Sequence, residues 1–371
     1  MSRQELLRSG DRIHHFDLLR GFFILLALYQ HYTGYFNHWF VSYFKESGEA
    51  LSLYYESFVP FIGVRLPMDQ CSYIFSLIFI PWVSQIYLTL ASFNLAKRTG
   101  LDFQQKLPAK LKVFALLFGF FLIENLIVAP DFGQGLSFYP IMAWMIILSM
   151  IGVLFRFGGI KMIWLLFALS FLRFPIPFTY ADTLSHFLQS WIHPSFEYDA
   201  RIEYYLSSGC LGFLMGHYYY HHNFGKRFHL PGIILGLVLI ALWFAFGDAY
   251  TVTRLDIYET EHDLTLSFLG LLYLIGVQLV VMLGFLKLEE MGFVIKCKPV
   301  SWVGVHSLLV FCFHRIYFIF IAGPIWSFYT SVIMEREPYN STIDIWMIMF
   351  FYLVGIAIIY KTKILELIAR S

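Results

Sequence analysis

Apolar windows of about 20 residues recur along nearly the whole chain, and this feature constrains the fold more than any other. A helix of about 20 residues is the length that crosses roughly 30 Å of hydrocarbon, so each window predicts one membrane-spanning helix. The ten windows cover residues 16–35, 71–95, 111–129, 137–156, 162–178, 202–221, 231–249, 264–286, 302–325 and 343–360. The sequence therefore predicts an all-α fold, a polytopic membrane helix bundle of about ten transmembrane helices that forms a single domain over residues 1–371.

Composition agrees with a membrane protein. Hydrophobic residues make up 58% of the chain and charged residues only 14%, against roughly 25% charged residues in soluble domains. The formal net charge of +1 gives no electrostatic attraction to nucleic acid, so membrane lipids are the expected surroundings and no nucleic-acid partner is expected. Residues 1–15 are polar and lack an apolar segment with a small-residue cleavage site, which predicts a cytoplasmic tail and no removable signal peptide.

The distribution of basic residues predicts the orientation. With ten spans, 18 of the 26 Lys and Arg residues fall on the same side of the membrane as the two termini. Cytoplasmic loops carry an excess of Lys and Arg, so both termini are expected in the cytoplasm, and the location expected is a bacterial cytoplasmic (inner) membrane. The sequence leaves open whether the protein forms a homo-oligomer.

The first apolar window contains three groups that hydrocarbon should exclude, namely Asp17, Arg20 and His31. At 3.6 residues per turn, Arg20 and His31 point within about 20° of each other, and Asp17 lies within about 60° of Arg20. The three side chains therefore share one helix face, which is the first candidate for an active site. A structural ion pair, with the histidine bonded to a neighbouring carbonyl, is the alternative interpretation.

Two other polar positions lie deep in apolar windows or interrupt them. Glu124 and Asn125 interrupt the third window, where an acidic group must be paired, protonated or functional. We expect this pair near the substrate, with Glu124 close to a basic residue. The four cysteines are widely scattered, and the histidines of the segment 217–223 lack further ligands at metal-binding spacing, so neither a disulfide framework nor a metal site is expected.

Asp17-Leu-Leu-Arg20-Gly21, with His31 eleven residues after Arg20, resembles the first-helix pattern of membrane acyltransferase family 3. Near the other end, Gly304-x-x-Ser307-x-x-x-Phe311-x-x-His314 is similar to a late segment of the same family at its Gly, Ser and His positions. These two motifs carry the resemblance.

The resemblance implies an acyl-CoA-dependent O-acyltransferase that moves an acyl group, most often acetyl, to a hydroxyl of a cell-envelope glycan such as a polysaccharide or lipopolysaccharide. His31 would act as general base or transient acyl carrier, Arg20 would bind the acyl-CoA donor, and Asp17 would support Arg20. His314 and Ser307 would line the substrate site. For His314, a structural histidine bonded to a backbone carbonyl is an equal alternative, and Ser307 has the alternative of packing helices. No tightly bound cofactor is implied, because acyl-CoA is a substrate.

Charges inside a membrane fit a second class of function equally well. A secondary transporter or flippase for a polar or lipid-linked envelope precursor also needs intramembrane polar groups. Transporters often show paired repeats with interrupted helices in corresponding halves, and no such repeat is found in this sequence. A sensory or scaffold membrane protein, whose charges only hold helices together, is the third interpretation.

Overall fold

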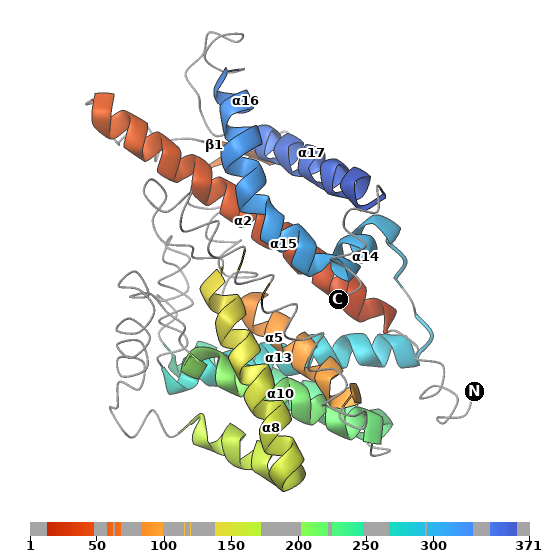
Figure 1. Ribbon diagram of the computed structural model, residues 1–371. Coiled ribbons are helices and arrows are strands. Elements are labelled where there is room, and N and C mark those ends of the chain that lie inside the picture. The colour runs from red at the N-terminus through yellow and green to blue at the C-terminus, as the bar shows by residue number, and fades with distance from the viewer. Residues whose placement is uncertain are drawn as a thin grey trace, which may run out of the picture. The chain divides into compact units, whose positions relative to one another are not determined.

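The computed structural model describes residues 13–47, 58–61, 64–67, 83–98, 115, 119, 138–171, 202–221, 225–247, 267–293, 295–328 and 342–361. These residues are helical apart from a short hairpin and the turns between helices, which confirms the prediction of a helical fold (Figure 1). The helices are α2 (His14–Ser47), α5 (Val83–Arg98), α8 (Phe138–Leu169), α10 (Ile202–His221), α11 (Gly225–Phe246), α13 (Phe268–Glu290), α14 (Lys298–Val305), α15 (Ser307–Tyr317), the π-helix η3 (Phe318–Ala322), α16 (Gly323–Phe328) and α17 (Thr342–Lys361).

Two strands lie in a segment where the sequence predicts only a loop. Strand β1 (Phe58–Phe61) pairs antiparallel with β2 (Val64–Pro67), with Phe58 opposite Pro67 and Phe61 opposite Val64. Runs rich in Phe and Val favour strands, but hydropathy windows of 20 residues cannot detect elements of four residues. The all-helical prediction therefore needs this one correction among the described residues.

Three helices are long and apolar enough to cross a membrane, at Ala143–Leu169, Phe228–Phe246 and Phe268–Glu290. The degree of burial distinguishes a helix packed inside the protein from a helix that faces its surroundings. Two thirds of the apolar window of α13 is buried (67%), whereas only 17% of the window of α11 is buried. Exposed Leu, Ile and Phe side chains on α11 would be unfavourable in water and suit contact with lipid. These findings indicate a membrane protein.

Helix α8 is two helical segments joined at a kink. Gly159 has φ of +64° inside the element, a conformation that side chains with a Cβ rarely adopt. The kink lies between the two apolar windows that the sequence separates there, 137–156 and 162–178. Glycine at this position thus lets the chain turn between two predicted spans (Figure 1).

The chain divides into two compact units. The first unit comprises Met1–Leu18, Ser76–Pro108 and Gln134–Cys297. Within it, α10 packs against α5 and α8, and α11 packs against α13. Small residues permit close backbone approach: a Cβ on Gly212 would lie 2.3 Å from the carbonyl oxygen of Thr89, and one on Gly236 would lie 2.7 Å from that of Gly276. Such glycine contacts are typical of packing between membrane helices.

A neutral hydrogen-bond network joins three helices in the core of the first unit. Ser208 on α10 donates to Gln85 Oε1 of α5 at 2.6 Å and accepts from Gln278 Nε2 of α13 at 2.8 Å. Thr89 Oγ1 donates to Gln278 Oε1 at 2.8 Å. All four side chains are fully or almost fully buried. Because nothing in hydrocarbon can replace these partners, the network fixes which faces of α5, α10 and α13 meet.

The second unit comprises Leu19–Phe75, Ala109–Gly133 and Lys298–Ser371. It contains most of α2, the hairpin, and the helices from α14 to α17. The predicted span 302–325 is not one regular helix here, because it is interrupted at His306 and then by η3. The ring of His306 stacks on Trp302 of α14, with centroids 4.7 Å apart, and meets the edge of Tyr360 on α17 at 4.3 Å.

Candidate functional site

Helix α2 carries the first motif. The side chains of Asp17 and Arg20 are buried or half-buried, as expected if this face of α2 packs against protein. Asp17 is 4% exposed in the first unit. Arg20 is half-buried in the second unit. The side chains of Asp17 and Arg20 each have at least one interaction partner. The backbone of His31 is part of α2, but its side chain lies outside the described residues. Glu124 and Asn125 also lie outside them.

The first and second motifs are in close backbone contact at Gly21. A methyl group added to Gly21 would lie 1.8 Å from the carbonyl oxygen of Val300 and 3.0 Å from the backbone nitrogen of Gly304. Gly21 ends the first motif and Gly304 begins the second. Only a residue without a side chain allows α2 and α14 to approach this closely. Segments about 280 residues apart in the sequence are therefore packed together in the second unit.

A second contact joins the same segments at Tyr32. This side chain is fully buried, and its hydroxyl donates a hydrogen bond to the carbonyl oxygen of His314 at 3.3 Å. The Tyr32 ring stacks on Phe318 of η3, with centroids 5.3 Å apart, and lies edge-on to Tyr352 of α17 at 6.4 Å. Tyr32 therefore contacts three elements of the second unit, and we call Tyr32, His314, Phe318 and Tyr352 the Tyr32 cluster.

His314 is fully buried in the centre of this cluster. Its Nδ1 forms a hydrogen bond with the carbonyl oxygen of Phe311, one turn earlier in α15, and its ring lies 6.1 Å from that of Tyr32. A carbonyl can only accept, so Nδ1 carries the proton of the neutral ring and Nε2 has the basic lone pair. This bond to a backbone carbonyl is the structural alternative stated above for His314, and it is compatible with proton transfer at Nε2.

The helix around His314 is irregular. Tyr352 donates its hydroxyl to the carbonyl oxygen of Val310, and α15 changes to the π-helix η3 at Phe318. Single π turns inside helices occur frequently at functional sites, because they reposition side chains and loosen the backbone hydrogen-bond ladder. Ser307, the first residue of α15, is half-buried and lies seven residues before His314, which places both on one face about two turns apart.

Helical geometry relates this packed face to the polar face that the sequence predicts. Gly21 and Tyr32 are eleven residues apart, so they point within about 20° of each other. Arg20 and His31 precede them by one residue each and are therefore rotated by about 100° around α2. The face with Gly21 and Tyr32 is the packed one, and the face with Arg20 and His31 lies beside it.

Sequence reasoning missed Tyr32 and Tyr352. A tyrosine in a membrane helix is usually an interfacial anchor, and neither residue belongs to a recognisable motif. The spacing of eleven residues between Gly21 and Tyr32, equal to that between Arg20 and His31, was the one available signal.

A buried histidine in the first unit was also missed. His15, at the start of α2, is fully buried, and its Nδ1 lies 3.0 Å from Glu289 Oε2 of α13. Its Nε2 accepts the backbone N–H of Ile295 at 3.2 Å, so Nδ1 is the nitrogen that donates to Glu289. The Glu289 carboxylate also accepts the backbone N–H groups of His14 and His15, at 3.3 and 3.4 Å. A carboxylate at a helix N-terminus stabilises the helix, so this cluster holds the beginning of α2.

Among the residues that the structure describes, no group of three or more His, Cys, Asp or Glu side chains is placed to hold a metal ion. In comparisons with known proteins, no family model, no curated protein and no solved structure matches this chain.

Proposed function

We propose that this protein is a membrane-embedded acyltransferase that moves an acyl group, most often acetyl, from a cytoplasmic acyl-CoA to a hydroxyl of a cell-envelope glycan. The observation that carries the proposal is the packing of the Gly21 end of the first motif against the Gly304 end of the second. The buried pair of Tyr32 and His314, further along α2 and on the next helix α15, supports it. Ten spans, cytoplasmic termini and an inner-membrane location are parts of this proposal.

The chemistry requires a base at neutral pH. An alcohol attacks a thioester poorly until its proton is removed, and neutral imidazole is suited to this step. In the proposed reaction the acceptor oxygen bonds to the thioester carbonyl carbon while His31 takes its proton. The carbon–sulfur bond then breaks, and the coenzyme A thiolate recovers the proton from His31. In the acyl-carrier variant, Nδ1 or Nε2 of neutral His31 attacks the thioester carbonyl carbon, the carbon–sulfur bond breaks and the coenzyme A thiolate leaves. The acceptor oxygen then takes the acyl group from the acyl-histidine, its proton passes to the thiolate, and neutral His31 is restored.

Arg20 is assigned to the donor. A guanidinium stays charged in a membrane and binds phosphate or a carbonyl through several N–H donors. It lies about 16 Å along α2 from His31, a distance that an extended pantetheine arm can bridge. Asp17, one turn before Arg20, would orient the guanidinium and reduce the cost of removing it from water. His314 and Ser307 would line the acceptor side, together with Glu124 and Asn125.

The experiment that tests this function is mass spectrometry of surface glycans from cells that produce the wild-type protein, the His31→Ala variant or no protein. We expect an acyl-dependent mass increase with the wild type alone. Membrane levels of the variant, measured by immunoblot, control for loss of the protein. Glycans that keep their acyl groups in the His31→Ala strain would contradict the proposed chemistry.

A transporter or flippase is the second candidate, and one observation favours it. The segment from α14 to α16 is interrupted at His306 and again at η3, and transporter binding sites are often built from discontinuous helices. Reconstituted vesicles separate the two functions. Passage of a labelled envelope precursor without covalent change would support the transporter, whereas transfer of radiolabel from acetyl-CoA to a glycan acceptor would support the enzyme.

A further inference from the structure

The kink of α8 exposes an unusual combination of side chains. Phe157 is 83% exposed, which makes it the most exposed large hydrophobic residue among those described. Arg156 and Lys161, on either side of the kink at Gly159, are exposed as well. Phe157 lies between these two cations in the sequence, so the kink presents an exposed apolar side chain and positive charge together.

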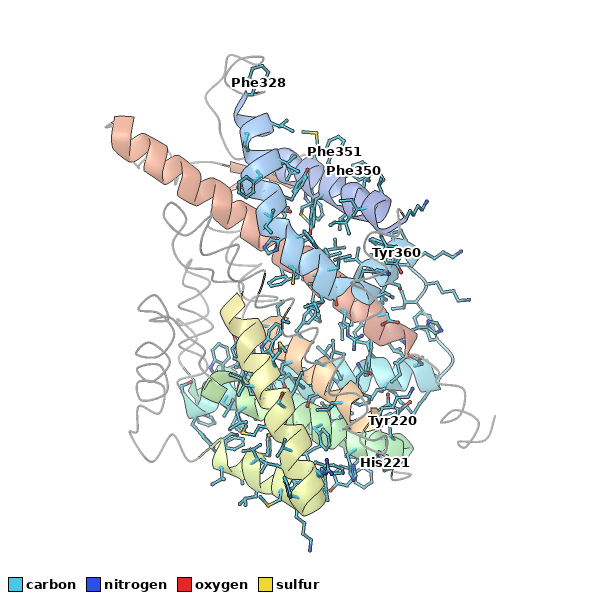
Figure 2. The ribbon with its side chains drawn as sticks, in the orientation of Figure 1. Tyr220, His221, Phe328, Phe350, Phe351 and Tyr360 are labelled. Carbon is cyan, nitrogen blue, oxygen red and sulfur yellow. The ribbon has the colours of Figure 1, made fainter. Side chains whose placement is uncertain are left out.

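Aromatic and histidine side chains extend this surface toward the ends of α10 and α5. Phe155 contacts the ring of His217 at 5.4 Å, and His217 contacts His221 at 5.0 Å. His221 Nε2 lies 3.1 Å from the carbonyl oxygen of Ala96, next to Lys97. Figure 2 shows Tyr220 and His221 together at this end of α10.

On the other side of the kink, Trp164 Nε1 donates to the hydroxyl of Tyr218 at 3.0 Å. Trp164 is 46% exposed, so an apolar ring with a polar edge faces outward here. Tryptophan and tyrosine concentrate where membrane hydrocarbon meets the headgroups. We call Arg156, Phe157, Lys161, Trp164, Tyr218 and His221 the kink surface.

The charged side chains of the kink surface, Arg156 and Lys161, are both positive. Neither α5 nor the segment 138–171 contains an Asp or Glu, and the one acidic residue of α10, Glu203, lies at the opposite end of that helix. No ion pair of Arg156 or Lys161 is found within the described residues. Lys287 of α13 differs, because its Nζ lies 3.9 Å from Glu290 Oε2.

We propose that the kink surface binds the headgroups of acidic phospholipids, with Phe157 inserted among their acyl chains. Two observations favour a lipid over a peptide or a nucleic acid. The exposed side chains of α8 on both sides of the kink, Val153, Leu165 and Leu169, continue the surface as an apolar face that suits hydrocarbon. Basic residues near an anionic membrane surface attract it, and the aromatic rings match its interfacial layer.

Lipid titration of the full-length protein tests the proposal. Phosphatidylglycerol and phosphatidylcholine with identical chains are added to the protein in detergent, and bound lipid is quantified by native mass spectrometry. A basic residue near an anionic surface contributes about fivefold in affinity, so Arg156→Gln with Lys161→Gln is expected to weaken phosphatidylglycerol binding roughly 30-fold and leave phosphatidylcholine unchanged. The matched control removes two exposed cations elsewhere, with Lys296→Gln and Lys298→Gln.

Phosphatidylglycerol binding that is unchanged in the first variant, or equally weakened in the control, would overturn the proposal. The wild type in high salt gives a second measurement that needs no substitution: screening should weaken phosphatidylglycerol binding selectively. Equal binding of the two lipids at low salt would also refute it. For the aromatic part, Phe157→Ser should weaken both lipids about tenfold, whereas Phe293→Ser, which changes another exposed phenylalanine, should not.

Discussion

Tyr32 donates its hydroxyl to the backbone carbonyl oxygen of His314 at 3.3 Å, which joins two residues that are 282 positions apart in the chain. This bond and the contact at Gly21 are two fixed points between α2 and the segment containing α14 and α15 in the second unit. Two contacts along one pair of segments define both their separation and their register. Residues between the contacts on α2, and those on the neighbouring face, are held in fixed positions as a result.

The first prediction concerns the contact at Gly21. Gly21→Ala should lower the free energy of unfolding by at least about 2 kcal/mol, because the new methyl group would overlap the Val300 carbonyl and force the helices apart. The thermal midpoint of the purified protein, followed by size-exclusion chromatography after heating, measures the effect. Gly355→Ala is the matched control, since a Cβ there meets nothing within 4 Å. Equal midpoints for the two variants would show that α2 and α14 are not closely packed.

A graded pair of substitutions tests Tyr32. Tyr32→Phe removes the hydrogen bond to His314 but keeps the ring stacked on Phe318, so a loss of about 1 kcal/mol is expected. Tyr32→Ala also removes the buried ring and should cost about 3–5 kcal/mol. Unfolding in mixed micelles with increasing SDS gives both values. A Tyr32→Ala variant as stable as Tyr32→Phe would rule out the Tyr32 cluster as a packed core.

Adjacent histidines provide a comparison at the start of α2. His15→Leu leaves the Ile295 N–H and the Glu289 carboxylate without the imidazole, whereas His14 is exposed and contributes only its backbone N–H to Glu289. Amide hydrogen exchange at Ile295 and in the first turn of α2 should therefore accelerate about tenfold or more in His15→Leu. The same amides should exchange at the wild-type rate in His14→Leu. Unchanged exchange in His15→Leu would contradict the role assigned to His15.

Arg20 is tested by kinetics, and this prediction depends on the proposed function. Arg20→Gln should raise the KM for acetyl-CoA roughly 10- to 100-fold with a smaller change in kcat, because hydrogen bonds to a charged donor-binding group are lost. Arg20→Lys should recover only part of the loss, since an ammonium lacks the planar fork of N–H groups. Arg156→Gln, outside the candidate site, is the control and should leave KM unchanged. A change in kcat with an unchanged KM for acetyl-CoA would show that Arg20 does not bind the donor.

Hydropathy predicted much of the helical architecture. The window 202–221 coincides with α10, and the windows 137–156 and 162–178 meet at the kink near Gly159. The prediction failed where no long apolar stretch marks an element. Helix α2 continues to Ser47, well past the predicted end at residue 35, and the hairpin 58–67 lies in a predicted loop. Helix propensity differs by only about 0.7 kcal/mol per residue or less among ordinary residues, so a helix can continue beyond an apolar stretch, and hydropathy shows where a membrane span ends and not where the helix ends.

The candidate site was predictable only in part, for a related reason. Charged groups in an apolar segment are conspicuous, so Arg20, Asp17 and His31 could be selected from composition and spacing. Gly21 and Tyr32 could not be selected in this way, because glycine and tyrosine are common in membrane helices. Their importance depends on Val300 and His314, and a single sequence does not show which distant segments meet. The prediction that Arg20 and His31 act together stays a prediction, since the His31 side chain lies outside the described residues.

The π-helix between His314 and α16 has a consequence for insertions and deletions. A π turn contains one residue more than an α turn. The wide turn takes up this extra residue, so deleting one amino acid from Phe318–Ala322 would let the segment wind as an ordinary α-helix while Gly323–Phe328 keeps its orientation relative to His314. A deletion in η3 would thus spare the helix that follows it, whereas a deletion in the regular helix α15 would turn every later side chain of the segment by about 100° relative to the residues before it.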